Sequence, residues 1–344
     1  MSDARESLLA VRLSSLGDLV HTLPVIPALR AGFPDARLDW VVDRRWLALM
    51  QLVEGLDAVI PLDRSPISYA GTVLRLRRAH YSCAVDFQGL YRTAVLTRLS
   101  GARRRVGRDR ATIREPGCER FYNERYAPGG RHIAEMSVSL AVHAGGRQPA
   151  TMTFPLRVPQ AESERVEQKL AQQGRRGYLV LSPGGGWRSK RWPPERFGAL
   201  ASEIWRRHGI RSVVNVSPGE RALADAVVAE VASDAAAARP LVMSPEITEL
   251  AALLAGASVV VGGDTGPVHL AAALGTRVVA LFGSTDPARN GPLPRGCVVQ
   301  NSVSEPPHYE RGDYPRGREH SPAMLSISVE QVLAAVEQEM SVTA

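Results

Sequence analysis

The stretch from Ser258 to Gly275 constrains the fold more than any other part of the chain. It opens with a β-branched apolar run, Val259 to Val261, continues through Gly-Gly-Asp-Thr-Gly-Pro, and closes with an apolar run that stops at Gly275. A short apolar run is typical of a buried parallel strand, and a proline near the start with a glycine at the end is typical of a capped helix. The stretch therefore predicts a strand, a tight turn and a helix of an α/β fold.

The turn of this unit gathers polar groups where the strand ends. The first-turn amides of a helix have no intrahelical partners and lie at the positive end of its dipole, so an anion is their natural ligand. Asp264, Thr265 and Gly266 form the turn, and His269 falls in the first helical turn. We interpret this turn as a phosphate site. The alternative is a capped crossover helix that binds nothing, with His269 as an ordinary helix residue.

The chain is too long for one ordinary core, and its two halves repeat one pattern. Its 344 residues favour two domains. Each half alternates short apolar strands with helices, which predicts an α/β fold of two Rossmann-like domains facing a central cleft. The expected boundaries are residues 1–148 for the first domain, 149–325 for the second, and 326–344 for a C-terminal helix that packs back towards the first domain.

Other features exclude several classes of protein. No apolar run reaches the ~18 to 20 residues of a membrane span, and the first residues lack a signal-peptide pattern, so a cytoplasmic location is expected. The three cysteines are far apart, and no histidine or carboxylate cluster has the spacing of metal ligands, so neither a metal nor another cofactor is expected.

Positive charge is concentrated in one segment, from Arg92 to Arg131. It holds eleven arginines and four acids, a balance of 11 − 4 = +7 that equals the net charge of the whole chain. A localised basic segment indicates an anionic partner: a nucleic acid, anionic lipid headgroups or an acidic sugar. The alternative is an arginine-rich surface without a function, because the whole chain is rich in arginine.

The loops of the second half offer groups that suit a sugar diphosphate. Lys190 is one of only two lysines beside forty arginines, and its compact ammonium could neutralise a departing diphosphate. Gly185 and Gly186, in the same loop, would let the backbone approach an anion closely. Glu220, which follows a strand and a Pro-Gly turn, could accept hydrogen bonds from ribose hydroxyls. The spacing of this loop is not that of a Walker P-loop.

The first loop of the first half contains one acid, Asp18. It lies where a strand passes into a helix, so helix capping alone would explain an aspartate there. The functional interpretation makes Asp18 the general base that takes the proton from an acceptor hydroxyl. The two interpretations are compatible.

Five motifs in order along the chain resemble one family, the ADP-heptose:lipopolysaccharide heptosyltransferases of glycosyltransferase family 9. They span Leu13–Pro24, Asp86–Leu90, Arg114–Asn123, Ser189–Pro193 and Gly263–His269. The third motif most resembles the heptosyltransferase I branch, which adds the first heptose to the Kdo region of the inner core. Two departures stand out. Gly185 and Gly186 lie where relatives often carry Ser or Thr, and the tail from Glu310 to Met324 more closely resembles other branches of the family, which commonly have a cysteine near Ala323.

The resemblance implies a GT-B fold and an inverting displacement, with Asp18 as catalytic base and Lys190 as the cation that stabilises the diphosphate. The donor-binding residues it implies are Gly185, Gly186, Glu220, Asp264, Thr265, Gly266 and His269. The acceptor-binding residues it implies are Ser15, Gly17, Gln88, Arg92, Arg105 and Arg114, with Arg98, Arg103, Arg104 and Arg108 as further candidates.

The partners implied by the resemblance are ADP-heptose, an anionic lipopolysaccharide acceptor (Kdo-lipid A) and the inner face of the cytoplasmic membrane. Three alternatives remain. One is a family 9 transferase acting on an outer-core sugar, an O-antigen sugar or a protein. The second is a nucleic-acid-binding protein, which the sparse aromatic residues of the basic segment disfavour. The third is a non-catalytic relative that only binds sugar nucleotides.

Overall fold

A computed structural model describes residues 6–63, 65–172, 177–231, 238–301 and 320–341. The chain divides into two compact units, Met1–Arg157 and Val158–Ala344. The division falls after the expected boundary at residue 148. The boundary lies later because the connecting segment pairs with the first unit. The amide of Glu54 donates to the carbonyl of Pro155 at 2.8 Å, and the amide of Arg157 donates to the carbonyl of Leu52 at 2.8 Å.

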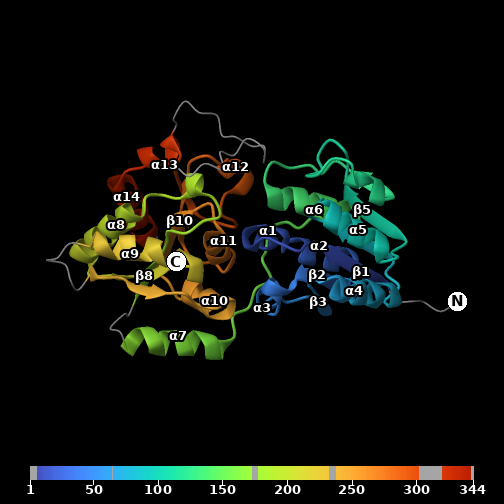
Figure 1. The fold of residues 1–344 in the computed structure, drawn as a ribbon, viewed down its shortest axis with the longest axis horizontal. Coiled ribbons are helices and arrows are strands. Elements are labelled where there is room, and N and C mark those ends of the chain that lie inside the picture. The colour runs from blue at the N-terminus through green and yellow to red at the C-terminus, as the bar shows by residue number, and fades with distance from the viewer. Residues whose placement is uncertain (1–5, 64, 173–176, 232–237, 302–319, 342–344) are drawn as a thin grey trace. The chain divides into compact units, whose positions relative to one another are not determined.

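The first unit is built on a six-stranded, fully parallel sheet of order β3-β2-β1-β4-β5-β6. Its strands are β1 (Ser7–Val11), β2 (Arg37–Asp43), β3 (Ala58–Leu62), β4 (Cys83–Asp86), β5 (Arg104–Arg108) and β6 (Glu124–Tyr126). Helices lie on both faces of this sheet (Figure 1), with α1, α2 and α6 packed together and α4 beside α5. These helices are α1 (Leu16–Thr22), α2 (Val25–Gly32), α4 (Pro66–Arg78), α5 (Tyr91–Leu99) and α6 (Ile133–His143), and the short α3 (Leu47–Met50) follows β2.

The second unit repeats this plan with the strand order β12-β11-β10-β7-β8-β9, again all parallel. Its strands are β7 (Tyr178–Ser182), β8 (Arg211–Asn215), β9 (Leu241–Met243), β10 (Val259–Gly263), β11 (Val278–Phe282) and β12 (Cys297–Gln300). Its helices are α7 (Gln160–Gln172), α8 (Pro194–His208), α9 (Arg221–Ala229), α10 (Ile247–Ala255), α11 (Gly266–Ala273), α12 (Pro287–Asn290), α13 (Pro322–Ser326) and α14 (Val329–Ser341). The predicted α/β class with two Rossmann-like units is therefore confirmed.

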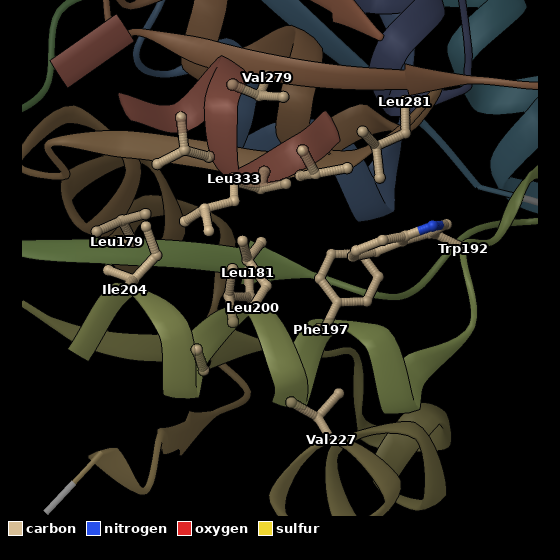
Figure 2. Packing of buried hydrophobic residues seen from close by; sticks show 14 of the residues in the cluster. Leu179, Leu181, Trp192, Phe197, Leu200, Ile204, Val227, Val279, Leu281 and Leu333 are labelled. Atoms are coloured by element: carbon tan, nitrogen blue, oxygen red, sulfur yellow. The ribbon is translucent and has the colours of Figure 1, made fainter. Parts of the chain in front are cut away.

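The core of the second unit lies between its sheet and α8 (Figure 2). Leu179 and Leu181 point to one side of β7 because side chains alternate along a strand, and Leu200 and Ile204 meet them because residues four apart share one side of a helix. The indole of Trp192 stands edge-on to the ring of Phe197, with centroids 4.9 Å apart. This packing anchors the chain just after Lys190.

The C-terminal helix α14 belongs to this same core. Val332, Leu333 and Val336 are buried on one side of α14, against α8 and strands β10 to β12. The buried side of α14 thus packs within the second unit, and the expectation that residues 326–344 pack back towards the first domain stays a prediction. The apolar stripe of α14 is needed to cover the second sheet, which would otherwise expose strand β11 to water.

Truncation of Leu200 to alanine is expected to lower the free energy of unfolding by about 2–5 kcal/mol, because the side chain is fully buried and leaves a cavity. Denaturant unfolding measures the change. Leu325→Ala, at a leucine that is 45% exposed, is the matched control and should stay within about 0.5 kcal/mol of wild type. Equal effects of the two variants would contradict the packing of α8 described above.

None of the described helices combines the length and the apolar character needed to cross a bilayer.

Candidate functional site

The polar residues predicted for the donor gather at one edge of the second sheet. Because all of its strands are parallel, the loops that follow β7, β8, β10 and β11 leave from the same edge. Lys190 follows β7, Glu220 follows β8, and Asp264 follows β10. The central position of β10, between β7 and β11, brings the 263–269 turn next to the loop that carries Lys190.

Lys190, Asp264 and His269 form one buried ionic cluster. The ammonium Nζ of Lys190 donates to Oδ2 of Asp264 at 2.7 Å, and Nε2 of His269 lies 2.8 Å from Oδ1 of the same carboxylate. The side chains of Lys190, Asp264 and His269 are 17%, 8% and 3% exposed. Each oxygen of the Asp264 carboxylate thus has one cationic or N–H partner. These two contacts hold the side chains of Lys190 and His269 in defined orientations.

The electrostatics of this cluster favour an ionised Asp264. Burial alone would raise its pKa, but the adjacent ammonium of Lys190 and the hydrogen bond and charge of His269 lower the pKa well below the usual value of an aspartate. An ionised carboxylate only accepts hydrogen bonds, so Nε2 of His269 carries the proton that points at Oδ1. Asp264 is therefore ionised at neutral pH.

Thr265 adds an unsatisfied hydroxyl beside this cluster. It is the N-cap residue of α11 in an extended conformation, yet its side chain makes no capping hydrogen bond. Its buried Oγ1 has no hydrogen-bond partner among the residues that the structure describes. Buried hydroxyls are nearly always hydrogen-bonded, so this one is a candidate contact for a ligand atom at the N-terminus of α11. Gly266, the first residue of α11, offers its amide at the same place.

Glu220 lies at this edge too, but its carboxylate already binds the protein. Oε1 accepts from the amide of Gly185 at 3.1 Å, and Oε2 accepts from the amide and the hydroxyl of Ser217 at 3.1 and 2.6 Å. A Cβ at Gly184 would lie 2.6 Å from Oε2, so only glycine allows this approach. Glu220 therefore ties the glycine loop to the turn after β8, besides any contact with a ribose.

The same loop is held from its other end by Arg191, which sequence reasoning did not single out. Nε and Nη2 of Arg191 donate to the carbonyl of Gly185 at 2.8 and 2.5 Å, and Nη2 lies 3.5 Å from Oε1 of Glu220. Gly186, next in the loop, has open space where a Cβ would be. The two glycines thus differ: the amide and the carbonyl of Gly185 are both engaged, and Gly186 lies beside unoccupied volume.

In the first unit, Asp18 lies in the first turn of α1, as predicted. The N-cap residue Ser15 donates to Oδ2 of Asp18 from its amide at 3.1 Å and from its hydroxyl at 3.0 Å, and Gly17 lies between them in the same turn. Nη2 of Arg12 lies 2.9 Å from Oδ1, and Nη1 of Arg114 lies 3.8 Å from Oδ2. Asp18 therefore helps to cap α1 and also lies between two cationic side chains, those of Arg12 and Arg114.

These neighbours keep Asp18 ionised. Burial alone would raise its pKa, but the guanidinium groups of Arg12 and Arg114 and the hydrogen bonds from Ser15 lower the pKa far below the ordinary value. Its side chain keeps 29% exposure, so a substrate hydroxyl can reach it. An ionised, accessible carboxylate with fixed orientation is what a general base requires.

Arg12 is the residue that the sequence analysis missed at this site. It is 3% exposed, and its Nη1 donates to the carbonyl of Phe87 at the end of β4. The signal that could have revealed it is a charged residue at the end of an otherwise apolar strand, directly before the loop of Asp18. A buried arginine in that position needs a carboxylate partner.

Of the acceptor candidates, Ser15, Gly17 and Arg114 lie beside Asp18, and the others have different surroundings. Gln88 is buried, and its Oε1 accepts from the amide of Leu13 at 2.8 Å, so it braces the loop that leads to Asp18. The guanidinium of Arg92 lies 3.9 Å from a carboxylate oxygen of Asp43. Arg105 donates to the backbone carbonyls of Phe121 and Ala102.

The further arginine candidates fall into two groups. Arg104 makes a two-pronged ion pair with Glu124, both contacts at 2.8 Å, and Arg108 is buried within β5. Arg98 and Arg103 are exposed. In the part of the chain that the structure describes, no group of three or more His, Cys, Asp and Glu side chains is placed to hold a metal ion.

Comparison with solved structures places the fold among glycosyltransferases. A family 9 glycosyltransferase from Veillonella parvula aligns with a TM-score of 0.84 at 20% identity, over 99% of this chain and 98% of that chain. The E. coli heptosyltransferase WaaC, solved with ADP, aligns with a TM-score of 0.75 at 24% identity, over 97% and 99%. The fold is thus the two-domain GT-B fold of glycosyltransferases.

Sequence comparison defines the family. The model of glycosyltransferase family 9 (heptosyltransferase) matches residues 72–313. The chain is 30% identical to lipopolysaccharide heptosyltransferase 1 of Pseudomonas aeruginosa over 304 residues, 85% of this chain and 82% of that protein. It is 28% identical to lipopolysaccharide heptosyltransferase 1 of Escherichia coli K12 over 87% of this chain and 94% of that protein. The chain therefore belongs to glycosyltransferase family 9 and is a glycosyltransferase.

Proposed function

We propose that the protein transfers heptose, with inversion, from ADP-heptose to the Kdo region of the lipopolysaccharide inner core, as a cytoplasmic reaction. Relatives named lipopolysaccharide heptosyltransferase 1 in several organisms support this choice of reaction. The observation that carries it is the second-unit site, where the unsatisfied hydroxyl of Thr265 lies at a helix N-terminus next to the Lys190–Asp264–His269 cluster. That combination suits a diphosphate.

The second unit would bind the donor through its phosphates. The ammonium of Lys190, the hydroxyl of Thr265 and the amide of Gly266 would contact phosphate oxygens, with Asp264 and His269 holding the ammonium and the turn in place. As the bond between the anomeric carbon and the phosphate oxygen breaks, negative charge develops on the departing ADP. Lys190 and the positive end of α11 would stabilise that charge.

The first unit would activate the acceptor. The acceptor hydroxyl gives its proton to a carboxylate oxygen of Asp18 while its oxygen forms the new bond to the anomeric carbon. The pair of electrons of the broken bond leaves with ADP. Because a single displacement attacks from the side opposite the leaving group, the configuration at the anomeric carbon inverts. Arg114 would bind an acidic group of the acceptor beside Asp18, which agrees with its partial exposure of 32%.

Calorimetric titration with ADP, ADP-heptose and UDP is the first experiment, followed by mass spectrometry of product formed on Kdo-lipid A. We expect binding that is selective for adenine nucleotides, and a product heavier than the acceptor by one heptose. Thr265→Val keeps the shape of the side chain and removes the hydroxyl, so it should weaken ADP binding by about tenfold, the loss of one hydrogen bond to a charged group. Absence of ADP binding to the folded protein would refute the donor assignment.

A panel of acceptors then separates the proposed acceptor from the alternatives. Product on Kdo-lipid A, and none on an acceptor that already carries the first inner-core heptose, would support the proposal. Product only on outer-core or O-antigen acceptors would refute the proposed acceptor while leaving the donor site intact.

Replacement of Arg12 with glutamine is expected to move the acidic limb of the pH–rate profile upward. Arg12 lowers the pKa of Asp18, so its loss returns that pKa towards the ordinary value of about 4. Asp18 must be ionised to act as base, so activity in the variant should fall as the pH drops towards that range, where wild type stays active. The measurement is kcat/KM against pH.

Two variants serve as controls for this prediction. Arg12→Lys keeps a positive charge and should restore most of the wild-type profile. Arg30→Gln removes a different, partly exposed arginine of the first unit, which binds Asp57 and two backbone carbonyls, and should leave the acidic limb in place. An Arg12→Gln enzyme that is folded and active with an unmoved acidic limb would show that Arg12 does not tune the base.

A further inference from the structure

The outer face of α4 carries apolar side chains that the core does not use. Ile67 is 87% exposed and Leu74 is 55% exposed, the two highest values among the large exposed apolar residues of the described chain. They are seven residues apart, which is two helical turns, so they lie on the same side of the helix. The small residues Ala70 and Gly71, between them, are exposed as well.

The opposite side of α4 fixes this orientation. Thr72 and Leu76 are buried, and Tyr69 and Val73 pack against the cluster that fills the space between the sheet and α4. Residues 69, 72, 73 and 76 follow the three- and four-residue spacing of one helical face. The helix therefore already has an apolar face that packs on the core, and Ile67 and Leu74 form a second apolar patch on its exposed side.

The charges of α4 are all of one sign. Its sequence from Pro66 to Arg78 contains no acid, and its last turn holds three exposed arginines, Arg75, Arg77 and Arg78. Cations at a helix C-terminus interact favourably with its dipole, and that explains arginines there without any partner. It does not explain exposed isoleucine and leucine on the same helix.

Basic and apolar groups continue on the neighbouring helix. Helix α5 lies beside α4 (Figure 1) and ends with exposed Arg98 and Leu99. A Cβ placed on Gly101, just after α5, would lie 3.8 Å from the side chain of Arg77, so the two helix ends are close. The combined surface presents aliphatic side chains bordered by guanidinium groups.

We propose that the outer face of α4 docks on an anionic phospholipid bilayer. Ile67 and Leu74 enter the interface between headgroups and acyl chains, and Arg75, Arg77 and Arg78 contact lipid phosphates, as in amphipathic helices that lie in the membrane plane. A nucleic acid would match the arginines but not the aliphatic pair. This docking is independent of the proposed transfer reaction, because α4 contains none of the residues assigned to it.

Vesicle sedimentation of the full chain tests the docking. Vesicles of phosphatidylcholine mixed with phosphatidylglycerol are compared with vesicles of phosphatidylcholine alone. We expect binding to the mixed vesicles that weakens with added salt, because salt screens the arginine–phosphate attraction. Equal binding to both kinds of vesicle, or binding to neither, would overturn the proposal.

Two variants separate the contribution of the arginines to vesicle binding from that of the apolar side chains. The triple variant Arg75→Gln, Arg77→Gln, Arg78→Gln should lower the partition coefficient by about a hundredfold, at about fivefold for each arginine. The double variant Ile67→Ser, Leu74→Ser should lower it by about tenfold or more, through lost burial of apolar surface. Both should keep the wild-type unfolding curve and affinity for ADP.

Matched controls remove charge or apolar surface elsewhere. The triple variant Arg165→Gln, Arg206→Gln, Arg207→Gln loses three exposed arginines of the second unit, and Val298→Ser loses an apolar side chain that is 38% exposed. Both controls should bind as wild type does. Losses equal to those of the α4 variants would mean that net charge or general surface apolarity, and not α4, sets binding.

An inserted probe distinguishes membrane insertion from adsorption by charge or self-association. Tryptophan emission of Ile67→Trp should shift to the blue with mixed vesicles and be quenched by lipids brominated on their acyl chains. Vesicle-bound protein without this quenching would overturn insertion of α4. Loss of a dimer in the Ile67→Ser, Leu74→Ser variant, with unchanged vesicle binding, would assign the face to a second copy of the chain and overturn the proposal as well.

Discussion

Replacement of Asp18 with asparagine is expected to lower kcat by about 10²- to 10⁴-fold, the usual contribution of a general base. The amide has the shape of the carboxylate, and its oxygen can still accept the capping hydrogen bonds from Ser15, but it cannot take a proton. Affinity for ADP should stay within a few-fold of wild type, because the residues proposed to bind ADP belong to the second unit. Steady-state kinetics with saturating ADP-heptose and calorimetry with ADP measure the two effects.

Asp63 provides a control that is matched in side-chain exposure and in the kinds of partner it binds. Like Asp18, it is 29% exposed, pairs with an arginine (Arg44) and accepts from a serine hydroxyl (Ser68). Asp63→Asn therefore removes a comparable charge and should leave kcat nearly unchanged. If Asp18→Asn retains turnover within a few-fold of Asp63→Asn, Asp18 is not the base. If both Asp18→Asn turnover and ADP affinity collapse, the defect is in folding.

The local parts of the fold could be predicted from the sequence. The stretch 258–275 forms the predicted strand and helix, β10 and α11, with Thr265 at the N-cap and the turn at the edge where ligands bind. The secondary structure of such a unit is determined by residues close together in the sequence. Here these are the β-branched apolar residues, the Thr-Gly-Pro at the start of the helix and the glycine after its end. Asp264 stands out because it directly follows an apolar strand, and Lys190 stands out because it is one of only two lysines beside forty arginines.

Long-range pairing could not be predicted from local patterns. Lys190 and Asp264 are 74 residues apart, and they meet because β10 inserts beside β7, a crossover that strand propensity does not specify. The arginine partner of Asp18 was missed because Arg12 directly follows the apolar strand β1, and a single charge at that position carries no periodic signal.

Strand β5 also escaped prediction. Its sequence, Arg104-Arg-Val-Gly-Arg108, lies in the basic segment and lacks the apolar run that is typical of a buried strand. It forms a strand because Arg104 pairs with Glu124 on β6, and because Gly107 lets the ring of Tyr122 pack where a Cβ would clash. Several arginines of the basic segment thus stabilise the first unit. Fewer arginines of this segment are therefore candidates for binding an anionic acceptor.

Replacement of Asp264 with asparagine is expected to have the largest effect on stability, about 3–5 kcal/mol, because it leaves the ammonium of Lys190 buried without its charge partner. The second unit should unfold at lower denaturant concentration, in the same transition that Leu200→Ala shifts. Binding of ADP should be lost too, because the carboxylate orients both Lys190 and His269.

The effect should depend on pH with a definite sign. The pKa of Asp264 is lower in the folded than in the unfolded chain, so the carboxylate stabilises the fold fully above the unfolded value of about 4. That stabilisation is lost as the pH falls from there through the folded pKa. The difference in unfolding free energy between wild type and Asp264→Asn should therefore be constant near neutrality and shrink below about pH 4.

Asp286 is the control for burial of an acid at this edge of the sheet. It is 8% exposed, follows β11 and caps α12 through the amide of Ala288. Asp286→Asn should cost about 1 kcal/mol or less, since asparagine also caps helices well. The double variant Asp264→Asn, Lys190→Met removes both charges and should regain much of the lost stability, because no buried charge is left unpaired. An additive double variant would show that the two side chains do not form the proposed unit.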